Sequence, residues 1–469
     1  MKQLKRNLRG SLILLLGFYT ILIVYFCYTL FVYSDRWFSD PNNSRVKVDM
    51  INPSIIPGKI FDRNQVLLVE TKSKTSKDGN TSYFRSYNED SRYAAHVIGS
   101  RQAGIGAEVL YVRYLLGYNN NLFERIYQKA FMEQEQGNNV ILTIDIRLQK
   151  LISNALGSRK GSIVLLNPTN GEVLAMVSQP TFDPSLEVKD IESVNLFNKA
   201  AFGKYPPGSI MKVITAAAAL QSLPGIDDYT VECKGTTNIE GVIINCYNNE
   251  AHGIVGLNRA MEVSCNAFFA KLALDLGWKE FRNTGQQFGF NQDFIYPDIK
   301  TIQSDLPINR NTESEELAWS AVGQGKVLTT PLHMALVAAS IANGGTMLEP
   351  KLIHSIQLRN GHIKPAASSK VLSKPLSIET AVRIQEMMIN VVKNGTGKGA
   401  QSPDLKIAGK TGTAEVQSGQ LPHAWFIGFA PADEPTLAIS IILENAGTGG
   451  SQAAPLASSI LSEAVKLGY

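Results

Sequence analysis

The chain has 469 residues, of which 44% are hydrophobic, and its formal net charge is only +4. This length exceeds what one hydrophobic core usually serves, so we expect a large domain and a smaller one. The small net charge gives no electrostatic support for a nucleic-acid partner, and none is expected.

The N-terminus combines a basic tail with a long apolar stretch. Lysine and arginine are frequent in residues 1–10, and residues 11–34 carry no charge. About 20 apolar residues cross the ~30 Å hydrocarbon layer of a bilayer, so residues 11–34 predict a transmembrane helix. A cleaved signal peptide is the alternative, but bulky Phe31 and Tyr33 stand where a cleavage site needs small residues. The basic flank predicts a cytoplasmic tail and a single-pass protein of the cell membrane, whose chain from about Asp35 lies outside.

Residues 35–139 are polar and broken by turn-forming residues, which predicts a small mixed pedestal domain. Within it, the charged run from Lys72 to Arg92 is interpreted as an exposed loop. The pattern then changes. Apolar residues 140–142 predict a strand, and Asp145 precedes a helical repeat of apolar residues. We therefore expect the larger domain to occupy residues 140–469.

The larger domain begins and ends with strands. Apolar, β-branched runs at 162–167 and 172–177 enclose a hairpin turn signal. Apolar runs rich in alanine and leucine then predict helices, three strand-like runs predict an antiparallel meander, and a closing helix is expected over 455–467. The expected helices are 209–220, 267–274 and 332–342, and the expected meander strands are 406–416, 424–429 and 436–443. This order predicts an α+β fold whose antiparallel sheet is assembled from both ends of the domain and flanked by helices.

The chain contains four cysteines and six histidines. Cys27 lies in the predicted membrane helix. Cys233 and Cys246 could form a disulfide outside the cell or remain thiols, and the sequence leaves both possibilities open. Neither the cysteine spacing nor the scattered histidines matches a metal-binding motif, so no metal site and no cofactor is expected.

Ser209 is the first candidate for chemistry. It follows two prolines and a glycine, which form a stiff turn and place it in the first turn of a helix. Lys212 lies on the same helical face, and the apolar residues that follow predict burial. Burial disfavours the ammonium form, so Lys212 could act as the base that activates Ser209. The alternative is a helix cap beside a solvated lysine, because Ser-x-x-Lys is a common pattern. Ser44 and Lys47 also fit it, and we assign them no function.

Two further polar groups stand in apolar surroundings. Ser264-Cys265-Asn266 interrupts a helical region, and Lys410-Thr411-Gly412-Thr413 opens a strand. Each group also has a purely structural interpretation. The first could be a break in a helix, and the second could be an edge strand whose charged lysine prevents aggregation. Gly412 indicates the close approach of another backbone or a ligand. His423 is a candidate only for lining the cleft.

The three groups follow a predicted membrane anchor in the sequence. In this order they resemble the motifs of the penicillin-binding protein and serine β-lactamase superfamily. Further similar stretches cover about residue 139 to the C-terminus, among them 142–145, 323–325 and 425–429. Upstream, residues 58–64 and 104–108 are similar to pedestal motifs of class B, monofunctional penicillin-binding proteins. Two departures are Gln65, where the family often has glycine, and Ser185, where it commonly has asparagine. Neither touches the inferred chemistry.

The resemblance implies a peptidoglycan D,D-transpeptidase of bacterial cell-wall synthesis, in division or elongation, with an all-helical subdomain beside its sheet. It implies an acyl-enzyme on the serine, formed with a stem peptide or with a β-lactam antibiotic. It also implies a SEDS-family glycosyltransferase as a membrane partner. The implied catalytic residues are Ser209, Lys212, Ser264, Asn266 and Lys410, and the implied substrate-binding residues are Thr411, Gly412 and Thr413.

Three alternatives remain open: a membrane-anchored β-lactamase, a D,D-carboxypeptidase, and a non-catalytic β-lactam sensor or scaffold. A sensor would be expected to carry several membrane helices, and an idle scaffold to have lost a motif residue. The pedestal is too short for the glycosyltransferase domain of the bifunctional class A relatives, so glycan polymerisation by this chain is not expected.

Overall fold

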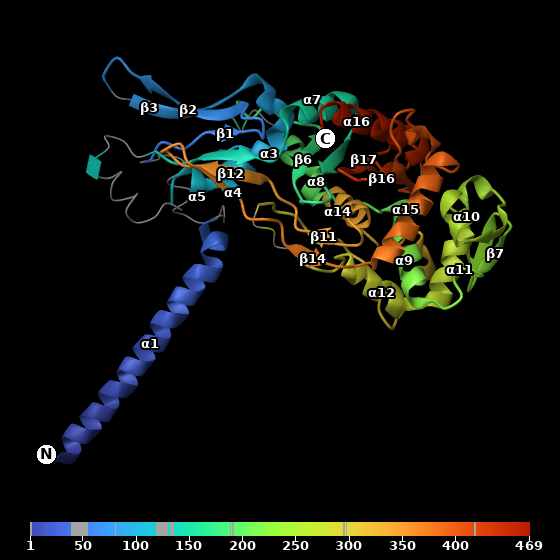
Figure 1. The fold of residues 1–469 in the computed structure, drawn as a ribbon, viewed down its shortest axis with the longest axis horizontal. Helices are drawn as coiled ribbons and strands as arrows, with labels where there is room; N and C mark the ends of the chain where they lie inside the picture. The colour runs from blue at the N-terminus through green and yellow to red at the C-terminus, as the bar shows by residue number, and fades with distance from the viewer. Residues whose placement is uncertain are drawn as a thin grey trace.

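The computed structural model describes residues 2–38, 55–79, 81–118, 130–131, 136–187, 189, 192–293, 296, 298–416 and 419–469. Helix α1 (Lys2–Phe38) projects from the rest of the chain, with the N-terminus at its far end (Figure 1). Its segment Arg6–Thr29 is long and apolar enough to cross a membrane and is not buried in the protein. No other helix among the described residues meets both criteria. The predicted apolar helix is therefore present, whereas Ser44 and Lys47 lie outside the described residues.

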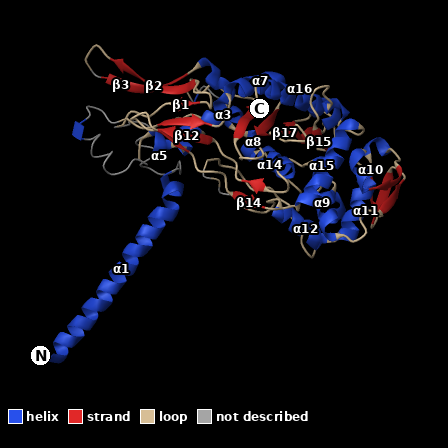
Figure 2. Ribbon diagram, viewed as in Figure 1, coloured by secondary structure: helices blue, strands red, loops and turns tan. Residues whose placement is uncertain are grey.

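A six-stranded sheet occupies the end of the molecule nearest α1 (Figure 2). Its strand order is β13-β12-β4-β1-β2-β3, and β1 pairs antiparallel with β2 and parallel with β4. The strands are β1 (Ile60–Phe61), β2 (Leu67–Thr75), β3 (Thr81–Tyr87), β4 (Asn139–Leu142), β12 (Ile353–Gln357) and β13 (Ile363–Pro365). Because β12 and β13 come from late in the chain, this sheet continues across the predicted boundary between the two domains.

The run from Lys72 to Arg92 is structured, and the prediction of an exposed loop was wrong. It forms most of the β2–β3 hairpin and enters the 3-10 helix η1 (Glu89–Ala94). The outer four residues of β2 are exposed. A strand whose two faces are both solvated needs no alternation of apolar and polar residues, so the hairpin left no strand pattern in the sequence.

A buried ion network fixes this hairpin to the helices that follow it. Glu108 is fully buried, and its carboxylate accepts hydrogen bonds from Nε of Arg85 at 3.0 Å and Nε of Arg101 at 2.8 Å. Arg85 also donates to the carbonyl oxygen of Gly58 at 2.8 Å. Removing one partner of such a network leaves a buried charge uncompensated, so the three side chains act as a unit. The helices here are α3 (Ala95–Ile98), α4 (Ala107–Leu110) and α5 (Val112–Leu115).

The larger domain is built on a five-stranded antiparallel sheet of order β15-β16-β17-β5-β6. The strands are β5 (Gly161–Leu166), β6 (Val173–Gln179), β15 (Ala408–Ala414), β16 (His423–Ala430) and β17 (Leu437–Leu443). Alternate residues face two cores. Ile439 and Ile441 pack with α7 (Ile146–Leu156) and α16 (Ala454–Lys466), whereas Ile442 packs on the side of α14 (Pro331–Ala342). The predicted hairpin, meander and α+β architecture are confirmed.

A helical part lies beside this sheet, on the side away from the six-stranded sheet (Figure 1). Its helices are α9 (Lys212–Ser222), α10 (Leu257–Glu262), α11 (Asn266–Leu276), α12 (Trp278–Gln287), α13 (Ser314–Ala321) and α15 (Ile378–Lys393). Contrary to the expectation, this part is not all-helical, because it also carries two small sheets, β7 (Thr230–Cys233) with β10 (Gly253–Gly256) and β8 (Thr236–Ile239) with β9 (Val242–Asn245). Four-residue strands are too short to show a reliable period.

The remaining elements are short connections: η3 (Ser193–Leu196), α8 (Lys199–Phe202), η4 (Gly208–Met211), η5 (Tyr247–Asn249), β11 (Met347–Leu348), β14 (Val371–Ser373), η6 (Lys398–Ala400) and η7 (Gly449–Ala453).

Candidate active site

Ser209 lies between the start of α9 and the strand β15, at a point where the backbones pack closely. Gly208 has a φ of +57° and begins the 3-10 turn η4, which leads into α9. A Cβ atom added at Gly208 would lie 2.7 Å from the carbonyl oxygen of Thr413, and one added at Gly323 would lie 1.8 Å from the carbonyl oxygen of Gly208. Only glycine permits both the conformation and the approach. Ser209 therefore lies in the first helical turn, as expected, and directly against β15.

Lys212 is fully buried and points at Ser209. Its Nζ lies 3.0 Å from Oγ of Ser209, and it also donates to the carbonyl oxygen of Ser264 at 2.6 Å and to Oδ1 of Asn266 at 2.5 Å. Burial lowers the pKa of Lys212 to about 8, although the nearby sulfurs of Cys265 and Cys246 act in the opposite direction. At this pKa roughly a tenth to a fifth of Lys212 is neutral near physiological pH, far more than of an ordinary lysine, and neutral lysine is a base.

Ser264 lies in the turn between α10 and α11 and contacts both lysines of the site. Its φ is +59°, a region that residues other than glycine rarely adopt. Its Oγ lies 3.1 Å from Nζ of Lys212 and 2.9 Å from Nζ of Lys410. Asn266 follows at the start of α11, and its Nδ2 donates to the carbonyl oxygen of Asn245 at 2.6 Å. Backbone strain of this kind persists where the surroundings over-determine it, which is common at functional sites.

Strand β15 brings the third group of predicted residues to the same place. Lys410 is fully buried, and burial together with the charge of Lys212 holds its pKa well below the usual range. Thr411 bonds through Oγ1 to Oγ1 of Thr396 at 2.7 Å. A Cβ atom at Gly412 would lie 2.9 Å from the carbonyl oxygen of Pro207, so the predicted close approach at Gly412 is that of the chain preceding Ser209.

The predicted residues surround one cleft of about 650 Å³. Those that line it are Ser209, Ser264, Asn266, Thr411 and Thr413. Lys212 and Lys410 lie behind this surface, and Gly412 packs beneath it. All eight candidates thus converge from the start of α9, the turn before α11 and the strand β15.

Part of the cleft wall was not predicted. It includes Cys246 and η5 with Tyr247, Asn248 and Asn249, and also Trp319, Thr396 and Thr448. The signal that could have been used is the Asn-rich stretch after Cys246, because asparagine tolerates positive φ. Asn248 and Asn249 have φ values of +51° and +55°.

Two other expectations have clear outcomes. His423 does not line the cleft: its Nδ1 accepts the backbone N–H of Asn445 at 3.0 Å, and its ring packs against Tyr205. Cys233 and Cys246 are not joined in this structure, since their Sγ atoms lie 3.6 Å apart, against about 2.05 Å in a disulfide.

Comparison with known proteins identifies the family to which this cleft belongs. Residues 161–462 match the family model described as the penicillin binding protein transpeptidase domain. The peptidoglycan D,D-transpeptidase PbpA of Mycolicibacterium smegmatis is 30% identical over 465 residues, with 92% of this chain and 93% of that protein covered. The peptidoglycan D,D-transpeptidase MrdA of Acinetobacter baumannii is 32% identical, but the match spans 71% of this chain and only 55% of that protein.

A solved structure agrees over almost its whole length. The ceftriaxone acyl-enzyme complex of penicillin-binding protein A from M. tuberculosis superposes with a TM-score of 0.80 at 29% identity, covering 88% of this chain and 99% of that one. The family model covers more than half of the 469 residues, and it includes every candidate residue of the cleft. The chain therefore belongs to the penicillin-binding protein transpeptidase family.

Proposed function

We propose that this chain is a peptidoglycan D,D-transpeptidase that works through an acyl-enzyme on Ser209. The observation that carries the proposal is the 3.0 Å contact between Oγ of Ser209 and Nζ of the fully buried Lys212, whose pKa lies at about 8. Similarity to PbpA and MrdA, both named peptidoglycan D,D-transpeptidases, supports the substrate. The division of the chain into a pedestal over residues 35–139 and a transpeptidase domain over residues 140–469 is part of the same proposal, with β4, β12 and β13 completing the pedestal sheet.

In the acylation step, neutral Lys212 accepts the hydroxyl proton of Ser209 while Oγ attacks the carbonyl carbon of the penultimate D-Ala of a stem peptide. The amide bond to the terminal D-Ala then breaks. The departing amine takes up a proton that passes from Lys212 through the hydroxyl of Ser264. The 3.1 Å distance between Nζ of Lys212 and Oγ of Ser264 supports this relay.

The developing oxyanion is assigned to the backbone N–H groups of Ser209 and Thr413. The close packing of Gly208 on the carbonyl of Thr413 brings these two stretches of backbone together and supports the assignment. Removing one donor of an oxyanion hole typically costs about 10² to 10³ in rate.

The rest of the site is assigned to substrate positioning. Lys410 supplies positive potential for the terminal carboxylate of the stem peptide, and Thr411 and Thr413 supply hydroxyl groups at the cleft surface. Asn266, held between Lys212 and the carbonyl of Asn245, orients the peptide amide. Gly412 keeps the strand close enough to Ser209 for these contacts.

Deacylation distinguishes the proposed activity from its rivals. In transpeptidation an amine of a neighbouring strand attacks the acyl carbon, the ester bond to Ser209 breaks, and the serine oxygen regains a proton from the attacking amine through Lys212. A D,D-carboxypeptidase or a β-lactamase would use water instead. β-Lactams are assigned as inhibitors that acylate the same serine.

A fluorescent penicillin tests the nucleophile. We expect covalent labelling of the wild-type chain and of Ser44→Ala, a matched control in the other Ser-x-x-Lys pattern. We expect no labelling of Ser209→Ala. A Ser209→Ala protein that still labels covalently would overturn the assignment, and release of the acyl group to water within seconds would favour a β-lactamase.

The membrane arrangement is proposed as well. The basic tail places the N-terminus in the cytoplasm and the catalytic domain outside. The apolar helix α1, which is not buried in the protein, and the pedestal, together residues 12–140, are proposed to contact a SEDS-family glycosyltransferase. A membrane-impermeant maleimide should label a cysteine introduced at exposed Lys77 on intact cells and should leave one introduced at Gln3 unlabelled. The reverse labelling pattern would reject this orientation.

A further inference from the structure

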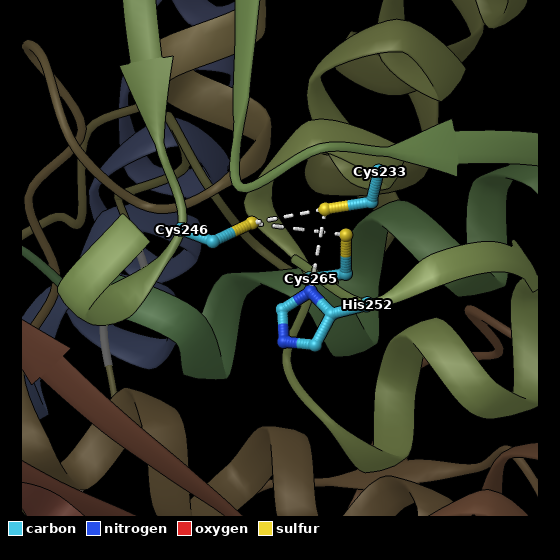
Figure 3. A group of neighbouring side chains, drawn as sticks. All are labelled: Cys233, Cys246, His252 and Cys265. Carbon is cyan, nitrogen blue, oxygen red and sulfur yellow. Dashed lines mark hydrogen bonds between the residues drawn. The ribbon is translucent and has the colours of Figure 1, made fainter. Parts of the chain in front are cut away.

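Four side chains that the reaction does not use meet in one wall of the cleft, which two of them, Cys246 and His252, line (Figure 3). They are Cys233 at the end of β7, Cys246 after β9, His252 before β10 and Cys265 at the start of α11. Each offers one ligand atom, and these four atoms all lie within 4.8 Å of one another. The three cysteines are buried.

Three of the six distances between the four atoms are close to the edges of a zinc tetrahedron, and the other three lie within 4.8 Å. Sγ of Cys246 lies 3.6 Å from Sγ of Cys233 and 3.8 Å from Sγ of Cys265, and Sγ of Cys233 lies 3.4 Å from Nδ1 of His252. Zinc bonds of about 2.3 Å to sulfur and about 2.0–2.1 Å to nitrogen, at tetrahedral angles, give edges of about 3.8 Å and about 3.5 Å. Three buried thiols alone could be core packing. A histidine nitrogen at the fourth corner distinguishes this cluster from such packing.

Backbone N–H groups point at two of the sulfurs and favour the thiolate, the form of cysteine that binds metal, although the contact with Cys246 and burial raise the pKa of Cys265. Cys265 is the N-cap of α11, and its Sγ accepts the backbone N–H of Phe268 at 3.4 Å. The sulfur of Cys246 faces the backbone N–H groups of Asn266 and Ala267 in the first turn of the same helix. Both sulfurs therefore lie at the positive end of the helix dipole. Donors of this kind are the outer-shell partners that metal-bound thiolates use.

We propose that Cys233, Cys246, His252 and Cys265 bind one Zn²⁺ ion in a closed structural site. Thiolate with imidazole is a ligand set that suits zinc, and four protein ligands leave no position for a reacting water. On binding, the three thiol protons pass to solvent, and three thiolates with a neutral imidazole and Zn²⁺ carry a net charge of −1.

Such an ion would hold a wall of the active site together. Cys265 stands between Ser264 and Asn266, and Cys246 directly precedes the η5 turn that lines the cleft. Cys246 also donates its backbone N–H to the carbonyl of Gly235 at 2.8 Å, in the segment that follows Cys233. The metal therefore links the β7–β10 and β8–β9 sheets to the turn that carries two of the proposed catalytic residues.

Metal content of the purified full-length chain in detergent tests the proposal without reference to activity. Elemental analysis should find one zinc ion per chain in the wild type and in Cys27→Ser, the matched control outside the cluster. His252 is partly exposed, so its substitution is tolerated by folding more readily than that of a buried cysteine. His252→Ala should bind zinc more than about 100-fold more weakly, because changes even outside the ligand shell cost about 10- to 100-fold. His252→Cys, which restores a fourth ligand, should retain the ion.

Cobalt provides a spectroscopic readout on the unaltered chain. After removal of zinc with a chelator, added Co²⁺ should give the intense visible bands of a tetrahedral site and a sulfur-to-cobalt charge-transfer band. Weak octahedral bands, no zinc after loading of the folded wild type, or a Cys233–Cys246 disulfide in peptide mapping of the freshly purified chain would each overturn the proposal.

Discussion

Lys212 and Lys410 share one acceptor, the hydroxyl group of Ser264. Their Nζ atoms lie 3.1 Å and 2.9 Å from the same Oγ, although one lysine comes from a helix and the other from the edge strand of the sheet. Both side chains are fully buried, and burial lowers the pKa of each. Two adjacent ammonium ions in this environment would repel each other, which favours one charged and one neutral lysine. The proposed roles require Lys212 to be the neutral one when the carboxylate of the bound substrate stabilises the charged form of Lys410.

The rate of acylation should therefore rise with pH. Only the neutral form of Lys212 accepts a proton, and burial lowers its pKa to about 8. We expect the rate constant for acylation by a penicillin to increase through this region and to level off above it. Stopped-flow measurement of labelling across the pH range checks the profile. A rate that falls as the pH rises towards 8 would contradict the assignment of Lys212 as the base.

Two substitutions of Ser264 should distinguish the role of its hydroxyl group from that of its backbone conformation. Ser264→Ala and Ser264→Gly both remove the proposed proton relay, so acylation should slow by about 10² in each, at the lower end of what proton transfer contributes. Glycine adopts the φ of +59° without strain, so Ser264→Gly should be more stable to unfolding than Ser264→Ala by about 1–2 kcal/mol. If Ser264→Gly acylates as fast as the wild type, the relay is wrong and the residue matters only for the turn.

Gly323 should tolerate no side chain, because its position allows Ser209 to lie against β15. A Cβ atom there would lie 1.8 Å from the carbonyl oxygen of Gly208, and Gly323 also has a φ of +85°. Gly79→Ala is the matched control, since Gly79 has a φ of +80° and no atom within 4 Å of an added Cβ. Chemical denaturation should show about 1–2 kcal/mol lost in the control. Gly323→Ala should lose about 1–3 kcal/mol more and acylate slowly. Equal losses would argue against the packing explanation.

Glu108 should make the pedestal sensitive to acid. Burial by itself raises the pKa of Glu108, but Arg85 and Arg101 together outweigh it and hold the pKa below 4.5. A lowered pKa in the folded state gives stability that is complete above about pH 4.5 and is lost as the pH falls through the lower folded value. Glu108→Gln should abolish this acid dependence and cost about 3–5 kcal/mol, because two buried arginines lose their partner.

The control for this prediction is Glu70→Gln. Glu70 pairs with the partly exposed Lys59 and Lys72, so its replacement should cost less than about 1 kcal/mol. Thermal unfolding of the three proteins at several pH values measures the difference. An acid transition that is unchanged in Glu108→Gln would show that another carboxylate is responsible.

Some features could be predicted from the sequence because they depend on neighbouring residues. The spacing of Ser209 and Lys212 places both on one face of a helix wherever that helix lies. Asp145 is the N-cap of α7 in the structure, accepting the backbone N–H of Arg147 at 2.8 Å, as its position before an apolar repeat predicted. The apolar stretch of α1 and the strands of the meander likewise follow from composition and period.

Other features depend on which distant segments meet. The hairpin from Lys72 to Arg92 has no apolar face of its own, and the strands β12 and β13 reach the pedestal sheet from more than 200 positions away from β4 and β1. The meeting of Cys233, Cys246, His252 and Cys265 is likewise invisible in their spacing, because it requires two small sheets to fold onto the start of α11.

The amino-acid sequence by itself determined the anchor helix, the α+β order of elements and the three polar groups of the candidate site, because local backbone geometry and burial patterns are short-range properties. Only the tertiary structure decided that Ser264 lies between Lys212 and Lys410, that η5 lines the cleft and that His423 does not. These relationships arise from close contacts between backbones, such as that of Gly208 with Thr413, and no local pattern encodes which segments will make them.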